Sequence, residues 1–226
     1  VAELDGRLSL HKTATVPSDP VAGVINSLAA AAEAAGEALA DYLARGTLLV
    51  HGTTHAINAI VTASTARTAF LTTQGHPDTL VWREGGRAEA FDFKTAYPEP
   101  YIPKALTFEI PGRIMVDGSV RTPLDEAATI AVLQRLAELK VEAVAVFFMN
   151  SYANPKHEEM AAARLKELLP GVYVTYSTEL TREWYEYERT STVAANAYVG
   201  PQVSAYIRRL ESEMDGKGFK GSLFMM

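Results

Sequence analysis

Hydrophobic and polar positions follow strand-like and helix-like patterns in turn along most of the chain. Short runs rich in apolar and β-branched residues predict strands at residues 47–51, 67–73, 141–148 and 172–176. Ala-rich or amphipathic stretches predict helices at about 20–43, 54–65, 122–139 and 155–169. Because strands alternate with helices, the pattern predicts an α/β fold, with a parallel βαβ crossover over residues 141–176.

Capping residues support several of these predicted helix starts. Ser18-Asp19-Pro20 supplies a capping side chain followed by a proline in the first turn, where its missing N–H costs nothing. Thr122-Pro123-Leu124-Asp125 is a capping box with Asp in place of Glu, and Thr53 or Thr54 caps the helix after residue 51. We therefore expect these helices to begin at well-defined positions.

Three segments depart from the regular alternation. Asp5-Gly6 is a turn dipeptide between two short runs and predicts an opening hairpin. Residues 75–103 have no periodicity, which predicts a long loop with at most one helical turn, and loops of this length are often functional. Pro111-Gly112 and Asp117-Gly118 punctuate residues 106–120 and predict an antiparallel excursion.

The C-terminal part is expected to be helical from residue 181 to 214. A break is predicted at Gly200-Pro201, because proline removes a helical hydrogen bond. Residues 222–226 resemble a strand cut in its middle, and the first residue is Val1 rather than Met. We therefore expect a piece of a longer polypeptide.

Composition narrows the class of protein. The 226 residues are 48% hydrophobic, which is enough to fill a core, and the formal net charge is −6 with no cluster of basic residues. This balance argues against a nucleic-acid surface, which needs clustered Lys and Arg. The absence of Cys excludes disulfides, a thiolate nucleophile and Cys-based metal sites, and a reducing cytoplasm is the expected location.

The longest apolar stretch, residues 21–43, does not predict a membrane span. It is interrupted by the polar residues Asn26, Ser27, Glu33, Glu37 and Asp41, whereas a span needs about 20 apolar residues. We expect no membrane contact.

Two apparent motifs carry little functional weight. Residues 216–221 fit the glycine pattern of a dinucleotide-binding loop, but a helix precedes them and a strand follows, the reverse of what that loop requires. His51 and His55 are four residues apart, yet no third ligand follows nearby. We therefore predict an exposed loop at 216–221, hydrogen-bonded structural roles for the histidines, and no metal site.

The segment His51-Gly52-Thr53-Thr54 lies where a predicted strand turns into a helix. Glycine permits close backbone approach, and threonine hydroxyls with free N–H groups form a natural site for phosphate or another anion. Ordinary helix capping explains the same residues. The residues alone leave both interpretations open.

Two further clusters have equally open interpretations. Residues 82–87 contain Arg83, Glu84 and Arg87 beside a pair of glycines, and guanidinium groups suit carboxylate or phosphate ligands, but a solvated loop has the same composition. Residues 186–192, with Glu188, Arg189 and Thr190 near a helix start, suit either capping or a functional site.

Several segments together resemble the hydantoinase A/oxoprolinase family, which includes N-methylhydantoinase A, 5-oxoprolinase and acetone/acetophenone carboxylase subunits. Their order and spacing match along essentially the whole chain. The segments are HGTTHAINAI (51–60), RTAFLTTQGHPD (67–78), LTFEIPGRI (106–114), DGSVRTPLDE (117–126), NSYANPKHE (150–158) and YERTSTVAANAYVGP (187–201).

The resemblance implies a fold and an activity. It implies an α/β lobe of the actin, Hsp70 and sugar-kinase type (ribonuclease H-like), with a mixed sheet flanked by helices and an added α/β subdomain. Residues 1–75 would then form a core portion lacking its first strand, 76–180 an inserted loop, hairpin and βαβ subdomain, and 181–226 a helical connection toward a second lobe. The implied reaction uses ATP and Mg²⁺ to phosphorylate a carbonyl, for cyclic amide hydrolysis or ketone carboxylation.

The resemblance also implies site residues and partners. Gly52, Thr53 and Thr54 would line the nucleotide or substrate cleft, and the other cleft candidates are His51, Arg83, Glu84, Glu188, Arg189, Thr190 and Asn196. No individual catalytic role transfers. Residues 83–86 and 97–101 look more like the ketone-carboxylase branch than the hydantoinase branch.

The family's Asp-x-Gly-Gly-Thr-x-Thr-Asp phosphate loop and second lobe do not occur in this sequence, so we expect the fragment to be inactive alone. A hydantoinase B-like second subunit is the implied partner. The alternative is a non-catalytic assembly module of a multisubunit complex.

Overall fold

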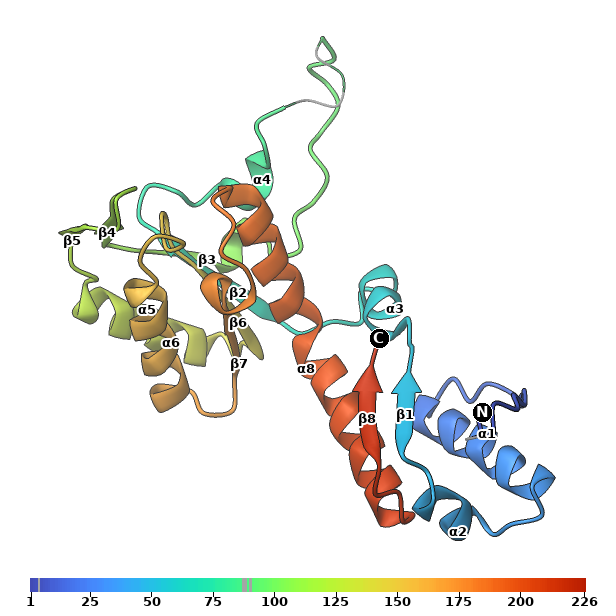
Figure 1. Cartoon of the computed structure of the whole chain (residues 1–226). Helices are drawn as coiled ribbons and strands as arrows, with labels where there is room; N and C mark the ends of the chain where they lie inside the picture. The colour runs from blue at the N-terminus through green and yellow to red at the C-terminus, as the bar shows by residue number, and fades with distance from the viewer. Residues whose placement is uncertain (4, 87–88, 90) are drawn as a thin grey trace. The chain divides into compact units, whose positions relative to one another are not determined.

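Strands and helices alternate along the chain, and they form two compact units (Figure 1). The computed structural model describes residues 1–3, 5–86, 89 and 91–226. The first unit consists of Val1–Asn58 and Val203–Met226, and the second of Ala59–Gln202. The three-part division of the chain at residues 75 and 180 stays a prediction.

The helices are Pro20–Ala34 (α1), Leu39–Ala44 (α2), His55–Val61 (α3), Thr79–Trp82 (α4), Glu126–Glu138 (α5), Lys156–Leu168 (α6), Ser177–Leu180 (α7) and Glu186–Gly216 (α8), with a 3₁₀ turn at Lys104–Leu106. The strands are Leu48–His51 (β1), Thr68–Thr73 (β2), Thr107–Ile110 (β3), Arg113–Ile114 (β4), Val120–Thr122 (β5), Ala143–Phe147 (β6), Tyr173–Tyr176 (β7) and Ser222–Met225 (β8).

A four-stranded parallel sheet forms the centre of the second unit, in the order β3-β2-β6-β7. Every residue of β2 and β6 is buried. A parallel sheet covered on both faces requires such runs, which explains why these strands are almost continuously apolar or β-branched. Helix α6 connects β6 to β7, so the predicted βαβ crossover is confirmed.

Side chains of the two central strands alternate between two apolar layers. Leu71 and Val144 belong to a layer that contains residues of α5 and α6. Phe70 and Phe147 belong to the other layer, with Val193 of α8. A register slip of one residue would exchange the layers, and each large buried side chain contributes about 1.5–3 kcal/mol, so the pairing is strongly specified.

A two-stranded parallel sheet, β1 with β8, forms part of the first unit. One face of it packs in a cluster with α1, α2 and the end of α8, where Leu43, Tyr206, Leu210, Met214 and Phe219 are buried. Among the described residues, no helix is both long enough and apolar enough to cross a membrane.

The α/β prediction is confirmed, including the single helical turn, α4, within the long loop. Residues 217–221 connect α8 to β8, as predicted, but the loop is not exposed throughout, because Phe219 is buried in the core cluster of the first unit. The antiparallel excursion is confirmed only in part, because β4 pairs with β5 while β3 adds to the sheet in parallel with β2. Parallel and antiparallel pairing thus occur in separate sheets rather than in one mixed sheet. The opening hairpin is reduced to one antiparallel bridge between Ala2 and Leu8.

Three helix predictions were wrong in detail. The stretch 20–43 is two helices, separated at Gly36, whose φ of +72° ends α1. The cap of α5 is Asp125, which accepts from Ala128 N, rather than Thr122. Helix α8 continues through Pro201 without the predicted break, because losing one backbone hydrogen bond does not outweigh the packing of a long helix.

We predict that Gly221→Ala destabilises the first unit by roughly 1–3 kcal/mol. A Cβ at this position would lie 2.5 Å from the Thr47 carbonyl oxygen and 2.6 Å from that of Gly46, and backbone atoms cannot rotate away. The matched control is Gly216→Ala, where a Cβ would meet nothing within 4 Å. Urea unfolding of both variants tests this, and equal unfolding midpoints would contradict it.

Candidate functional site

The turn between β1 and α3 is open to solvent. Gly52, Thr53 and Thr54 are all exposed. A Cβ at Gly52 would have only Met226 Cε nearby, at 3.9 Å. The segment therefore has the accessibility that a ligand-binding turn requires, although accessibility does not by itself identify a ligand.

The polar groups of this turn also cap the following helix. Thr53 Oγ1 accepts a hydrogen bond from His55 N (3.2 Å), and Thr54 Oγ1 accepts one from Asn58 Nδ2 (3.3 Å). Thr53 N donates to the Met226 carbonyl (3.4 Å). Capping thus accounts for contacts of both threonines. Helix α3 has only seven residues, so its dipole adds little attraction for an anion. Ligand binding by Gly52, Thr53 and Thr54 stays a prediction.

His51, at the end of β1, has the hydrogen-bonded role predicted for it. Its Nε2 lies 2.6 Å from the hydroxyl of Tyr206, a residue of α8. Burial lowers the pKa of His51 below its usual value, which favours the neutral ring. Across the described part of the chain, no group of three or more His, Cys, Asp or Glu is placed to hold a metal.

A buried charge network joins the second unit's sheet to the start of α8. Glu158 and Arg189 are both fully buried. Nη1 of Arg189 donates to the hydroxyls of Ser151 (2.5 Å) and Ser177 (3.1 Å), and each hydroxyl donates onward to Glu158 Oε1 at 2.7 Å. The two serine hydroxyls therefore connect the two charged side chains through hydrogen bonds.

Glu158 is further saturated by the ends of the neighbouring strands. It accepts from Phe148 N after β6 (2.9 Å), and from the N–H and hydroxyl of Thr178 after β7 (2.9 and 2.8 Å). A carboxylate with this many donors is stable in a buried site. The network fixes the carboxyl ends of β6 and β7 relative to each other.

Arg189 is less completely satisfied than Glu158. Its guanidinium lies 4.8 Å from the Phe147 ring centroid and 5.3 Å from that of Tyr152, but Nε and Nη2 have no hydrogen-bond partner. Burial lowers the pKa of Arg189, and the charge of Glu158 opposes that shift. Its predicted place on the helix is correct, but its side chain is enclosed rather than open to solvent.

The other predicted residues of α8 have local partners. Thr190 is buried and its hydroxyl donates to the Glu186 carbonyl (2.6 Å), while the Glu188 carbonyl accepts from Thr192 Oγ1 (2.7 Å). Asn196 is half-buried and donates to Thr175 Oγ1 (3.0 Å). These contacts are structural, and a ligand role for the residues stays a prediction.

The loop cluster with Arg83 and Glu84 begins where α4 ends, at Trp82. Arg83 and Glu84 are exposed after α4, and Arg83 has a φ of +55°. Arg87 lies outside the described residues. A common role for Arg83, Glu84 and residues 188–196 in a cleft stays a prediction.

Sequence analysis did not single out a polar pair beyond the carboxyl end of β2. His76 Nε2 lies 3.0 Å from Arg113 Nη1, and burial, together with the Arg113 charge, lowers the pKa of His76. The neighbouring Gly75 N donates to Glu109 (2.5 Å). The only sequence signal was their place after a buried strand, where parallel sheets position functional groups.

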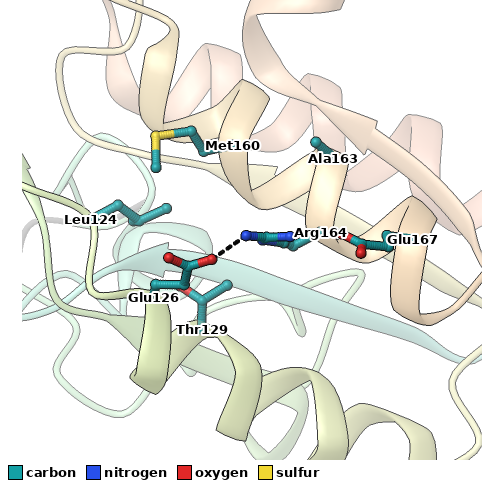
Figure 2. Close-up of a pocket in the computed structure, with 7 residues that line it drawn as sticks. All are labelled: Leu124, Glu126, Thr129, Met160, Ala163, Arg164 and Glu167. Carbon is teal, nitrogen blue, oxygen red and sulfur yellow. Dashed lines mark hydrogen bonds and ion pairs between the residues drawn. The ribbon is translucent and has the colours of Figure 1, made fainter.

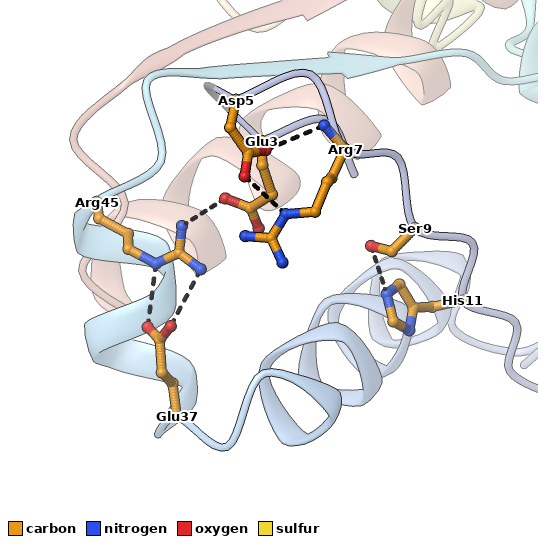
Figure 3. Close-up of polar contacts among 7 residues, drawn as sticks. All are labelled: Glu3, Asp5, Arg7, Ser9, His11, Glu37 and Arg45. Atoms are coloured by element: carbon orange, nitrogen blue, oxygen red, sulfur yellow. Dashed lines mark hydrogen bonds and ion pairs between the residues drawn. The ribbon is translucent and has the colours of Figure 1, made fainter.

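Two cavities lie away from the predicted residues. In the second unit, a cavity of about 280 Å³ between α5 and α6 has Arg164 paired with Glu126 and Glu167 at its rim (Figure 2). In the first unit, Arg45 bridges Glu37 and Glu3 beside a cavity of about 570 Å³ (Figure 3). The guanidinium groups of Arg164 and Arg45 are therefore each paired with two carboxylates.

We predict that Glu158→Ala destabilises the second unit by about 3–5 kcal/mol, because it leaves the Arg189 charge buried without its counter-ion. Glu159→Ala, at the exposed neighbouring position, should change stability by no more than about 0.5 kcal/mol. Chemical denaturation measures both. Similar losses for the two variants would show that the network is not the cause.

Stability should fall as the pH drops below about 6.5. Burial lowers the pKa of His51, His76 and His157 in the folded chain. Below about pH 6.5 the unfolded chain therefore binds more protons than the folded chain. The free energy of unfolding then falls by at most about 1.4 kcal/mol per pH unit for each histidine. Unfolding midpoints at pH 7.5 and 5.5 test this; His157→Gln should lose less stability than the parent on acidification, and an equal loss would contradict the prediction.

Known proteins resemble the chain over nearly its full length. It is 36% identical over 220 residues to caprolactamase subunit alpha of Pseudomonas jessenii, covering 96% of this chain and 32% of that protein. It is 29% identical over 243 residues to the acetophenone carboxylase gamma subunit of Aromatoleum aromaticum, covering 100% and 33%. The chain thus spans about a third of the length of these relatives.

The crystal structure of ATP-dependent caprolactamase from Pseudomonas jessenii matches the fold. It has a TM-score of 0.90 and 35% sequence identity, covering 100% of this chain and 33% of that one. This likeness agrees with the predicted fold class. The family model of the hydantoinase/oxoprolinase N-terminal region matches residues 1–169. The chain therefore belongs to the hydantoinase/oxoprolinase family and carries its N-terminal region.

Proposed function

We propose that this chain is the N-terminal part of an ATP-dependent enzyme subunit that activates a carbonyl group by phosphorylation. The observation that carries the proposal is the likeness of the whole chain to the ATP-dependent caprolactamase structure at 35% identity. The activity belongs to a longer protein, because the relatives are about three times as long. The isolated chain is expected to be inactive.

A cyclic amide is the proposed substrate class. Identity to the caprolactamase subunit, 36%, exceeds identity to the acetophenone carboxylase subunit, 29%. Residues 83–86 and 97–101 look more like the carboxylase branch, but they cover a small part of the chain. Overall identity therefore favours cyclic amide hydrolysis, such as that of a hydantoin or 5-oxoproline, over ketone carboxylation.

The turn at Gly52–Thr54 is the proposed contact for the nucleotide. When bound, ATP supplies the phosphoryl group that activates the carbonyl. The fit is favourable in part: space around Gly52 allows close approach, and Thr53 and Thr54 are exposed hydroxyls. His51, Glu188, Arg189, Thr190 and Asn196 stay proposed neighbours of the site, and Arg83 and Glu84 proposed substrate contacts.

The described residues do not fit a protein-held Mg²⁺. They contain no cluster of three or more acidic or histidine side chains that could ligate one, and Mg²⁺ in nucleotide sites is held mostly by phosphates and water. The proposed role of this chain is limited to binding and orientation.

A second subunit is proposed to complete the reaction. Two relatives are themselves named as subunits, alpha and gamma, which supports a multisubunit enzyme. We propose a hydantoinase B-like partner and, in keeping with the Cys-free sequence, a cytoplasmic location.

A non-catalytic assembly module is the second candidate. The observation that favours it is the exposed aromatic surface of the long loop, where Trp82 is 54% and Phe91 91% exposed. Exposed aromatic side chains are typical anchors of protein interfaces.

In the longer protein with its partner, Thr53→Ala with Thr54→Ala should raise the KM for ATP about tenfold or more, because two hydroxyl contacts are lost. Phosphate release on addition of a lactam measures this. Thr122→Ala, at an exposed position on β5, is the matched control. Unchanged turnover with disrupted subunit assembly would favour the assembly module, and phosphate release with a ketone but no lactam would favour carboxylation.

A further inference from the structure

Three residues from the end of β1 to the start of α3 converge on one side chain of α8. The hydroxyl of Tyr206 lies 2.6 Å from His51 Nε2, across 155 residues of sequence. The ring of His55 stacks on the phenol ring, with 4.7 Å between centroids and 20° between planes. The Thr53 side chain also acts on this hydroxyl, where it lowers the pKa of Tyr206. Alternate residues of the segment 51–55 thus contact the same phenol.

The phenol ring of Tyr206 is buried in the core of the first unit. Tyr206 is 8% exposed and packs in the apolar cluster with Val21, Leu43 and Leu210. Burial raises the pKa of Tyr206, while the Thr53 hydrogen bond opposes that rise. The phenol is therefore protonated at neutral pH and has a hydrogen available for the neutral His51 ring, whose own pKa burial lowers.

The turn stays open to solvent although it is anchored. Gly52, Thr53 and Thr54 are all exposed, and a Cβ at Gly52 would meet only Met226 Cε, at 3.9 Å. One buried side chain therefore holds the turn in place while its residues stay accessible. A preorganised turn binds a ligand at a smaller cost in conformational entropy than a mobile one.

We propose that Tyr206 is a positioning residue for the ligand-binding turn Gly52–Thr54, acting through His51, Thr53 and His55. The inference rests on the proposed function, since the ligand is the phosphate-bearing nucleotide proposed above. Sequence analysis did not single out Tyr206, because it lies within a long helix far from the turn in sequence. Its role is to orient the turn and not to touch the reacting atoms.

The first test examines the 226-residue chain by NMR of its histidine side chains. At neutral pH, His51 should be neutral with its proton on Nδ1, since Nε2 accepts the phenol hydrogen. Tyr206→Phe should raise the His51 pKa by about half a unit, because the variant removes one hydrogen bond to the neutral ring. Tyr198→Phe is the matched control, on the same helix with its ring against Tyr101. An unchanged His51 pKa in Tyr206→Phe would overturn the proposal.

The second test measures kinetics in the longer protein with its partner. Tyr206→Phe should raise the KM for ATP about two- to tenfold and leave kcat nearly unchanged, because the turn loses its anchor but keeps its ligand groups. His51→Gln keeps an acceptor for the phenol and should be affected less than His51→Leu. A purely structural role would lower the yield of folded protein without this split between KM and kcat.

The outcomes separate this inference from the function on which it rests. If the Thr53→Ala, Thr54→Ala variant raises the KM for ATP and Tyr206→Phe does not, Tyr206 is no positioning residue and the nucleotide turn stands. If neither variant changes the KM, the turn is not a nucleotide site and both proposals fail.

Discussion

Burial of a parallel sheet on both faces is the constraint on which the second unit depends. Strands β2 and β6 have no exposed residue, so each face must be covered by apolar side chains from elsewhere. Helices α5 and α6 contribute to one layer, and the first part of α8 to the other. This covering brings the start of α8 against the carboxyl ends of the strands and encloses Arg189 there. A charge in that position requires a partner, and Glu158 supplies it through Ser151 and Ser177.

The first unit is organised by a different long-range contact. The end of β1 and the start of α3 are tied to α8 by the phenol of Tyr206. Capping and ligand binding are not exclusive at the turn between them. Thr53 and Thr54 can orient the first turn of α3 through one lone pair of each hydroxyl while remaining exposed. A turn that is anchored inside and open outside is suited to hold an oxygen-rich ligand.

Family membership gives the chain a chemical context that its own geometry does not supply. The described residues contain no cluster of three or more His, Cys, Asp or Glu side chains that could hold a metal. The relatives named caprolactamase and acetophenone carboxylase differ in substrate but share this N-terminal region. In the function proposed above, this part of the polypeptide binds and orients a ligand, and the remaining two thirds of such proteins determine which carbonyl reacts.

The sequence by itself determined the local elements of this protein. The periodicity of apolar residues predicted β1, β2, β6, β7 and most helices, because buried positions recur with the period of the strand or helix. The motif segments were sufficient to identify the family. Local signals failed where packing outweighed a short-range preference. At Pro201, the helix-breaking tendency of proline predicted a break, but α8 continues through this residue.

Only the tertiary structure decided which residues meet. Arg189 and Glu158 are separated by 31 positions (189 − 158), and Tyr206 and His51 by 155, with no pattern in the intervening sequence to connect them. Their side chains become partners because α8 packs against elements that lie far before it in the sequence. Hydrophobic periodicity specifies which face of a helix is buried, but the identity of the polar group opposite that face depends on how the elements pack together.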